Sequence, residues 1–309
     1  MLKLDNILVY HWHAWKGFLI SHLVADYCQV EAQYDDDIKD LEAHLTPNIR
    51  AVLFQVNLSC ASHFPARRQQ LIDALKKRNI LVLNTEIEDI TKRNLYHLLD
   101  KAGLKTTQAN QTGSAKQLLF VKSNLNCGGV AEQRLPEDLQ KKLLPEDPPI
   151  LGKGDDYFIV KRSDIRPELW KDTNIVIENY IYNPENSFYR VYVFGDSIVV
   201  VKAHSNGVIK KISGDDRDCN ILLRKQHIIS QRVELPTALQ VTIKTFITHY
   251  PLAYFCLDII HDNYDYYIID LNLTPYSGTD EQNTEVLEFL CDGAQYHLNQ
   301  VEHREFALP

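Results

Sequence analysis

Two apolar runs near the C-terminal end of the chain constrain its fold more than any other feature. Residues 252–260 (LAYFCLDII) and 264–273 (YDYYIIDLNL) flank the polar residues 261–263 (HDN). Apolar runs of this length around a polar break predict a β-hairpin with a short turn. Strand alternation then gives one shared face to Tyr266, Ile268, Asp270 and Asn272. The hairpin therefore presents a carboxylate and an amide on the same side.

Asp258, on the first strand of this hairpin, adds a second carboxylate. Any register with a loop of about four or five residues places it close to Asp270. Like charges opposed on a sheet are destabilising, so a cation is expected near them. With the amide of Asn272, these side chains offer only oxygen ligands, which suit magnesium or manganese better than zinc. The alternative is an edge hairpin whose acidic side chains merely face water.

The order of these residues resembles the metal-binding end of ATP-grasp enzymes. In that family an Asp precedes a hairpin, and an acid-x-Asn sequence, a proline and a glycine follow, as they do here. This chain has Asp270-Leu271-Asn272 where the family most often has Glu-x-Asn. The resemblance implies that Asp258, Asp270 and Asn272 bind Mg²⁺ or Mn²⁺ beside ATP.

The first 84 residues have the pattern of a small parallel α/β lobe. Short apolar runs predict strands over residues 6–10, 50–56 and 80–84, and apolar spacing predicts helices over 16–34 and 67–77. Such alternation of strands and helices indicates a parallel sheet. No Gly-x-Gly-x-x-Gly follows the first strand, so the lobe need not bind a dinucleotide.

The unusual segment HWHAW, residues 11–15, follows the first predicted strand. Open α/β sheets bind ligands at this end of their strands, so a substrate-binding role is one interpretation. Aromatic packing beneath a loop, with the histidines at the surface, is the other interpretation and the favoured one.

Two lysines beyond this lobe extend the resemblance. Lys92 lies in the first turn of a predicted helix that Gly103 ends, near backbone N–H groups that can bind phosphate. Lys122 ends a predicted strand and precedes SNLNCGGV, in which Gly128 and Gly129 let backbone amides turn toward an anion. The resemblance implies that both lysines bind nucleotide phosphate and that the glycine-rich segment is a mobile cover.

The middle of the chain is similar to the part of the family that holds the nucleoside. Residues 175–181 (IVIENYI) predict a strand, in which Glu178 matches the hinge acid beside the adenine amino group. The resemblance implies that backbone groups near Ile181 also read the base and that Glu185 contacts the ribose. A predicted helix within residues 131–157 is interpreted as an insertion in a lid subdomain.

The alternating run over residues 187–205 predicts a second hairpin, with its turn at Gly195 and Asp196. If the apolar alternation is respected, Arg190 and Lys202 both point inward, and an inward arginine is seldom buried without an anion. The resemblance implies that Lys202 binds the nucleotide and that Arg190, with Lys122, acts in catalysis.

Charge and cysteine content exclude several other classes of protein. A net charge of −8 argues against a nucleic-acid partner. The six cysteines lack Cys-x-x-Cys spacing, which indicates reduced thiols. The first residues lack the pattern of a signal peptide, and no apolar run approaches the ~20 residues that span a bilayer. We therefore expect a cytoplasmic protein with no membrane partner.

Together these features predict an α/β (α+β) fold with a Rossmann-like N-terminal lobe, residues 1–84, and a two-subdomain ATP-grasp domain, residues 85–309. The lid subdomain is expected at about residues 106–178. The resemblance implies an ADP-forming ligase that uses ATP and Mg²⁺ or Mn²⁺ to join a small-molecule or peptide carboxylate to an amine through an acyl phosphate. A homodimer is compatible with the sequence.

Two other functions stay open at this point. ATP-grasp kinases that phosphorylate a hydroxyl include inositol phosphate kinases with an Asp-x-Asn ending, which fits Asp270, although their phosphate-rich substrates call for more basic residues. A nucleotide-binding protein without turnover is the second alternative, because a shorter carboxylate can weaken metal binding.

Overall fold

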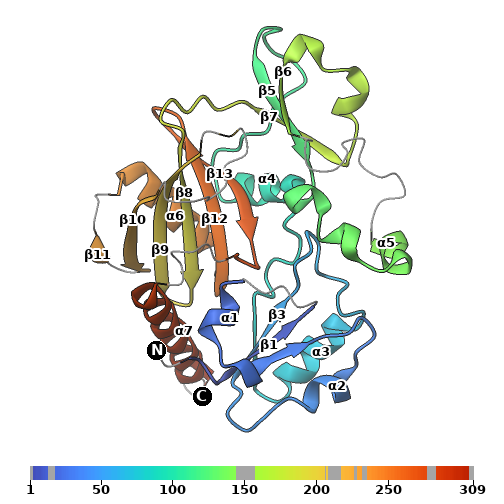
Figure 1. Cartoon of the computed structure of the whole chain (residues 1–309), viewed down its shortest axis with the longest axis vertical. Coiled ribbons are helices and arrows are strands. Elements are labelled where there is room, and N and C mark those ends of the chain that lie inside the picture. The colour runs from blue at the N-terminus through green and yellow to red at the C-terminus, as the bar shows by residue number, and fades with distance from the viewer. Residues whose placement is uncertain are drawn as a thin grey trace.

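The computed structural model describes residues 3–12, 18–143, 157–205, 207, 217–225, 228–231, 235–276 and 283–305. Its strands form three sheets, of four, six and three strands. In Figure 1 the four-stranded sheet lies at the bottom, the six-stranded sheet above it and to the left, and the three-stranded sheet at the top. Residues 13–15 of HWHAW and residues 277–278 after the predicted metal-binding hairpin lie outside the described residues.

The N-terminal lobe is a parallel α/β layer, as predicted. Its sheet has the order β2-β1-β3-β4, and every neighbouring pair is parallel. The strands are β1 (Ile7–His11), β2 (Gln29–Glu31), β3 (Ala51–Gln55) and β4 (Leu81–Leu83), and the helices are α1 (Ile20–Leu23), α2 (Ile38–Glu42) and α3 (Arg68–Lys76). Trp12 packs against Phe64 with ring centroids 5.0 Å apart, so this part of HWHAW serves the core of the lobe.

The helix predicted over residues 16–34 is wrong. After α1 the backbone of Val24 is extended (φ −105°, ψ 153°), and β2 then pairs in parallel with β1, with Val9 opposite Gln29. Apolar spacing over this segment does not distinguish a long helix from a short helix followed by a strand. Pairing with a distant strand decides the outcome, because it satisfies backbone groups that a helix would otherwise bond locally.

The three-stranded sheet has the order β6-β5-β7 and is antiparallel. It comprises β5 (Leu118–Ser123), β6 (Phe158–Lys161) and β7 (Ile175–Asn179). Helix α4 (Lys92–Lys101) precedes it and ends where Gly103 adopts φ 69°, as predicted, and α5 (Glu137–Leu143) lies in the insertion. Short 3-10 turns occupy Asp26–Cys28, Asn126–Gly129, Glu132–Arg134, Arg162–Asp164 and Pro167–Trp170.

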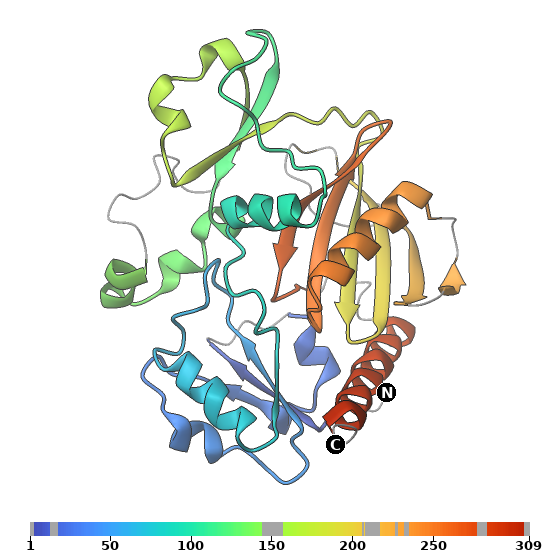
Figure 2. The same cartoon turned by 180° about the vertical axis from the view of Figure 1, so that it is seen from behind.

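The six-stranded sheet is antiparallel and has the order β11-β10-β9-β8-β12-β13. Its strands are β8 (Ser187–Phe194), β9 (Ser197–His204), β10 (Arg217–Arg224), β11 (Ile228–Gln231), β12 (Tyr254–His261) and β13 (Tyr266–Asn272). Helix α6 (Thr237–His249) covers one face, and the N-terminal part of α7 (Thr284–Glu305) packs on the other (Figures 1 and 2). Both predicted hairpins are present.

One apolar core joins the N-terminal lobe to the six-stranded sheet. It contains Leu23 of α1, Leu53 of β3, Val201 of β9 and Leu290 of α7, all nearly inaccessible to solvent. The boundary between the two domains at residues 84 and 85 stays a prediction, and this core contains residues from both sides of it. Within the described residues, no helix is both long enough and apolar enough to cross a membrane.

Candidate functional site

A cavity of about 710 Å³ lies where the three sheets meet. It is lined by side chains of the N-terminal lobe, the glycine-rich segment, the strand pair β5 and β7, and the hairpin β12–β13. Of the residues that the sequence singled out, the cavity lining includes Lys92, Lys122, Gly128, Glu178, Ile181, Arg190, Asp258, Asp270 and Asn272. Residues scattered over about 180 positions of sequence therefore meet in one place.

The hairpin brings its two carboxylates face to face. Asp258 pairs with Asp270 in the β12–β13 register, and the register shifts by one residue immediately afterwards, where Ile259 pairs with Ile268. This β-bulge leaves Ile269 extra, so Ile268 points into the apolar core beside α6 instead of sharing a face with Asp270. The alternation predicted for Asp270 and Asn272 holds, and both line the cavity.

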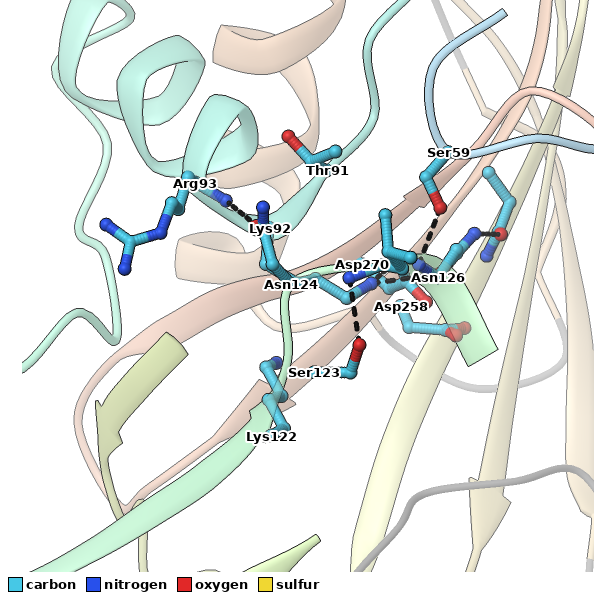
Figure 3. Close-up of polar contacts among 12 residues, drawn as sticks. Ser59, Thr91, Lys92, Arg93, Lys122, Ser123, Asn124, Asn126, Asp258 and Asp270 are labelled. Atoms are coloured by element: carbon cyan, nitrogen blue, oxygen red, sulfur yellow. Dashed lines mark hydrogen bonds and ion pairs between the residues drawn. The ribbon is translucent and has the colours of Figure 1, made fainter. Parts of the chain in front are cut away.

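Side-chain cations and amides from other elements contact these acidic and amide groups, and Figure 3 shows Lys92 and Asn126 close to Asp270. Arg190 lies opposite Asp258 on the neighbouring strand and donates from Nε and Nη2 to its two carboxylate oxygens, at 2.6 and 2.7 Å. Lys92 donates to Asp270 Oδ1, and Asn126 Nδ2 lies 2.5 Å from Asn272 Oδ1. The charge repulsion expected in this hairpin is thus offset by an arginine and a lysine.

A second buried cluster surrounds Glu178 on β7. Its Oε1 accepts from Tyr96 and Thr107 at 2.6 and 2.7 Å, and Lys122 Nζ lies 2.9 Å from the same atom. Burial lowers the pKa of the Lys122 ammonium, and attraction to Glu178 offsets part of that effect. Burial also raises the pKa of the Tyr96 phenol well above its ordinary value. Glu178 thus orders the strand end on which Lys122 lies.

The glycine-rich segment has an uncommon backbone. Cys127, Gly128 and Gly129 have φ values of 46°, 66° and 75°, in the left-handed region that glycine adopts without steric cost. The segment is tied to the N-terminal lobe, because Asn126 N donates to Ser59 Oγ at 2.8 Å. Asn126 Oδ1 in turn accepts from Lys92 Nζ at 3.0 Å. The two predicted phosphate-binding elements are therefore in direct contact.

Three of the predicted nucleotide-binding residues, Gly129, Glu185 and Lys202, are not among those that line the cavity. Lys202 pairs with Tyr189 across the β8–β9 hairpin, whereas Arg190 pairs with Val201. Neighbouring positions on a strand point to opposite faces, so Arg190 and Lys202 lie on opposite faces of the sheet, and of the two only Arg190 lines the cavity. Lys202 Nζ lies 3.4 Å from Glu185 Oε2, and neither side chain is among those that line the cavity.

The structure adds residues that the sequence did not single out. Ser59, Asn126 and Glu132 line the cavity beside the predicted set. Ser59 follows the C-terminal end of β3, the sheet end where α/β folds bind ligands, and that position was a usable signal. Glu132 offers no such signal, since its place depends on the packing of the glycine-rich segment against the N-terminal lobe.

The oxygen atoms of the hairpin side chains are the candidate ligands for a metal ion. Within the described ranges, no group of three or more His, Cys, Asp and Glu side chains could hold a metal ion. Asp258, Asp270 and Asn272 form a set of two carboxylates and one amide, in which every donor atom is an oxygen. Such a set fits a hard cation such as Mg²⁺, which usually takes one or two carboxylates and completes its shell from substrate and water.

No family model matches the chain, and no curated protein matches it. Among solved structures, the chain is similar to D-alanine-D-alanine ligase from Bacillus anthracis complexed with ATP, with 14% identity and a TM-score of 0.52 over 98% of this chain and 100% of that one. It is also similar to the ATP-grasp ligase PsnB complexed with a minimal precursor, with 13% identity and a TM-score of 0.54 over 95% and 99% of the two chains. At this level of identity, the likeness shows a shared fold.

Proposed function

Because the chain has the ATP-grasp fold, we propose that it is an ADP-forming ligase that uses ATP to join a carboxylate to an amine. The observation that carries the proposal is the convergence of two buried lysines on one cavity. Lys92 and Lys122 are 4% and 5% exposed and come from α4 and β5, yet both line the cavity that Asp258 and Asp270 enter. Buried cations from separate elements suit a polyanionic ligand such as a nucleoside triphosphate.

The placement of the other cavity residues supports an ordered nucleotide site. We propose that Glu178 and the backbone near Ile181 bind the adenine, since both line the cavity on the β7 side. Lys92, Lys122 and the amides near Gly128 would hold the phosphates. Asp258, Asp270 and Asn272 would hold Mg²⁺ or Mn²⁺, which neutralises phosphate charge when bound.

The reaction then needs little covalent chemistry from the protein. A substrate carboxylate oxygen attacks the γ-phosphorus of ATP, the bond to the β–γ bridging oxygen breaks, and ADP leaves. The neutral amine nitrogen attacks the acyl carbon of the resulting acyl phosphate, inorganic phosphate leaves with the carbon–oxygen bonding electrons, and the proton lost by the nitrogen passes to the departing phosphate. Lys92 and Lys122 stabilise charge on the transferred group, and Arg190 fixes the carboxylate of Asp258 by two hydrogen bonds.

The test is ADP release in the presence of hydroxylamine. The full chain is incubated with ATP, Mg²⁺ and pools of amino acids and short peptides as carboxylates, and both ADP and hydroxamate are measured. We expect both products, since hydroxylamine attacks an acyl phosphate. ADP with a stable phosphorylated product and no hydroxamate would overturn the ligase proposal in favour of a kinase. If ADP release stays at background with every pool, the ligase proposal is overturned in favour of a nucleotide-binding protein without turnover.

Matched lysine variants on one helix control the assay. Lys92→Met removes a cation from the cavity while keeping the length of the side chain. Lys101→Met makes the same change at an exposed position at the other end of α4. If Lys92→Met loses ADP release and Lys101→Met does not, turnover takes place in the cavity.

A further inference from the structure

One carboxylate in the cavity has no place in the nucleotide chemistry above. Glu132 lies in the 3-10 turn that follows the glycine-rich segment, and its side chain is 5% exposed. Its Oε1 accepts from the backbone N–H of Ser59 at 2.6 Å. Its Oε2 is inaccessible to solvent and has no hydrogen-bond partner in the part of the chain that the structure describes.

An unsatisfied buried carboxylate oxygen costs free energy, so its retention calls for a partner. Oε2 lies beside the glycine-rich segment, 3.8 Å from the position that a Cβ on Gly129 would occupy. Glu132 also lines the cavity. A ligand in the cavity would therefore lie beside this carboxylate, and the chemistry that satisfies a buried carboxylate best is a cation that donates hydrogen bonds.

The position of Glu132 is fixed from both sides. Its neighbours Ala131 and Leu135 belong to the core of the N-terminal lobe. The bond to Ser59 N holds its carboxylate at the end of β3, and Ser59 Oγ accepts from Asn126 N. In this arrangement one hydrogen bond and the packing of its neighbours position the carboxylate, as a specificity residue needs.

The same contacts connect Glu132 to the proposed phosphate site. Asn126 contacts Lys92 Nζ at 3.0 Å and Asn272 Oδ1 at 2.5 Å, so hydrogen bonds through Ser59 and Asn126 link Glu132 to the hairpin. The cavity lining carries four cations, Lys92, Lys122, Arg134 and Arg190, and four carboxylates, Glu132, Glu178, Asp258 and Asp270. Among these carboxylates, Glu132 is the one with a buried oxygen that has no partner in the described residues. A phosphate anion would avoid Glu132, whereas an ammonium group would be attracted to it.

We infer that Glu132 is the residue that recognises a cationic amine, the ammonium group of an amino acid or other primary amine that occupies this cavity next to the nucleotide. The inference rests on the proposed ligase function for the order of events, but the binding of an ammonium group can be measured without turnover. It assigns Glu132 to substrate specificity and gives it no part in phosphoryl transfer.

The probes are twenty amino acids and their N-acetyl derivatives, in matched pairs. Binding to the full chain is measured by calorimetry with a non-hydrolysable ATP analogue and Mg²⁺, and ADP release is measured separately with ATP. We expect at least one free amino acid to bind and its N-acetyl partner to bind about tenfold more weakly or not at all. Equal binding of both members of every pair would overturn the inference.

The variant Glu132→Gln tests the residue itself. Its amide oxygen can still accept from Ser59 N, so the fold is expected to survive while the charge is lost. We expect affinity for the free amino acid to fall about tenfold or more with ATP affinity within about twofold. Glu137→Gln, an exposed position on the first turn of α5, is the matched control and should change neither. If Glu132→Gln does not fold, the paired probes on the parent chain still decide.

The two proposals can fail separately. Ammonium-dependent binding that requires Glu132, without ADP release, would contradict the ligase proposal and support the amine subsite. Hydroxamate formation with an unchanged amine affinity in Glu132→Gln would keep the ligase and overturn the subsite. Neither binding nor turnover with any probe would overturn both.

Discussion

Lys122 Nζ lies 2.9 Å from Glu178 Oε1, and both side chains are buried. The pair spans two antiparallel strands, β5 and β7, whose register places Phe120 opposite Glu178 and Lys122 opposite Val176. Burial lowers the pKa of Lys122 from the ordinary value of 10.5, although Glu178 favours the charged form. The lysine proposed to hold phosphate is therefore easier to deprotonate than an ordinary lysine.

This pKa predicts proton uptake when ATP binds at alkaline pH. In the free protein Lys122 begins to lose its proton below pH 10.5, and the added phosphate charge raises its pKa again, so binding takes up a proton. Calorimetry in buffers of different ionisation enthalpy near pH 9 measures that uptake. Lys122→Arg, which stays charged, should remove it, whereas Lys101→Arg should not. Proton release on binding would contradict the assignment.

The same pKa has a consequence for stability. Lys122 binds fewer protons in the folded chain than in the unfolded chain, so the free energy of unfolding rises with pH between the lowered folded pKa and the unfolded value of about 10.5. Lys122→Met should abolish this contribution. Urea unfolding of both proteins at several alkaline pH values gives the difference in slope.

Asp270→Asn is expected to reduce ADP release by about a hundredfold or more with little change in folding, since it removes one anionic ligand and keeps the shape of the side chain. The neutral amide can still accept from Lys92, which preserves the local contact seen here. Steady-state ADP release and thermal unfolding are the measurements. Asp265→Asn, at the turn of the same hairpin and not among the residues that line the cavity, removes an exposed pair with Lys105 and is the control. Activity within about twofold of the parent would remove Asp270 from the site.

Alanine substitutions at Gly128 and Gly129 should weaken ATP binding to different extents. At Gly128 a Cβ meets nothing within 4 Å, so the left-handed backbone alone costs about 1–2 kcal/mol. At Gly129 the Cβ would in addition lie 2.8 Å from Leu125 Cδ1. We therefore expect Gly129→Ala to weaken ATP binding more than Gly128→Ala does, as measured by calorimetry. Equal effects would mean that Leu125 moves aside, and the reverse order would contradict the prediction.

Hydrogen exchange tests whether this segment closes over nucleotide. Amides of residues 123–130 should exchange more slowly when ATP is bound, because phosphate and the closed loop protect them. Exchange that is equally slow with and without nucleotide would contradict a mobile cover. Amides of β12 serve as the internal reference, since that strand lies between two others.

Gly293→Ala is expected to destabilise the chain although it lies in a helix, where alanine normally gains about 1 kcal/mol over glycine. A Cβ at this position would lie 2.3 Å from Ser197 Oγ and 2.5 Å from Ser197 N, so α7 would have to move off β9. Urea unfolding should show a loss of about 1–3 kcal/mol. Gln300→Ala, exposed on the same helix, should change stability by less than about 0.5 kcal/mol.

The local features of the site follow from the sequence because they depend on neighbours along the chain. A polar break between two apolar runs suffices for the hairpin that pairs Asp258 with Asp270. A glycine pair after a strand suffices for the left-handed turn at Gly128 and Gly129. Backbone sterics and strand pleating act over a few residues, so these patterns can be recognised in the amino-acid sequence.

Other features depend on contacts between distant segments, and only the tertiary structure decided them. The bulge at Ile269 sends Ile268 into the core, and the register of the β8–β9 hairpin places Lys202 on the face away from Arg190. The hydrogen bond from Ser59 N to Glu132 requires the glycine-rich segment to pack on the N-terminal lobe. The sequence by itself determined which residue types and turns were present. Long-range pairing and burial determined which of them share a cavity, because strand register and core packing are settled between segments that no local pattern relates.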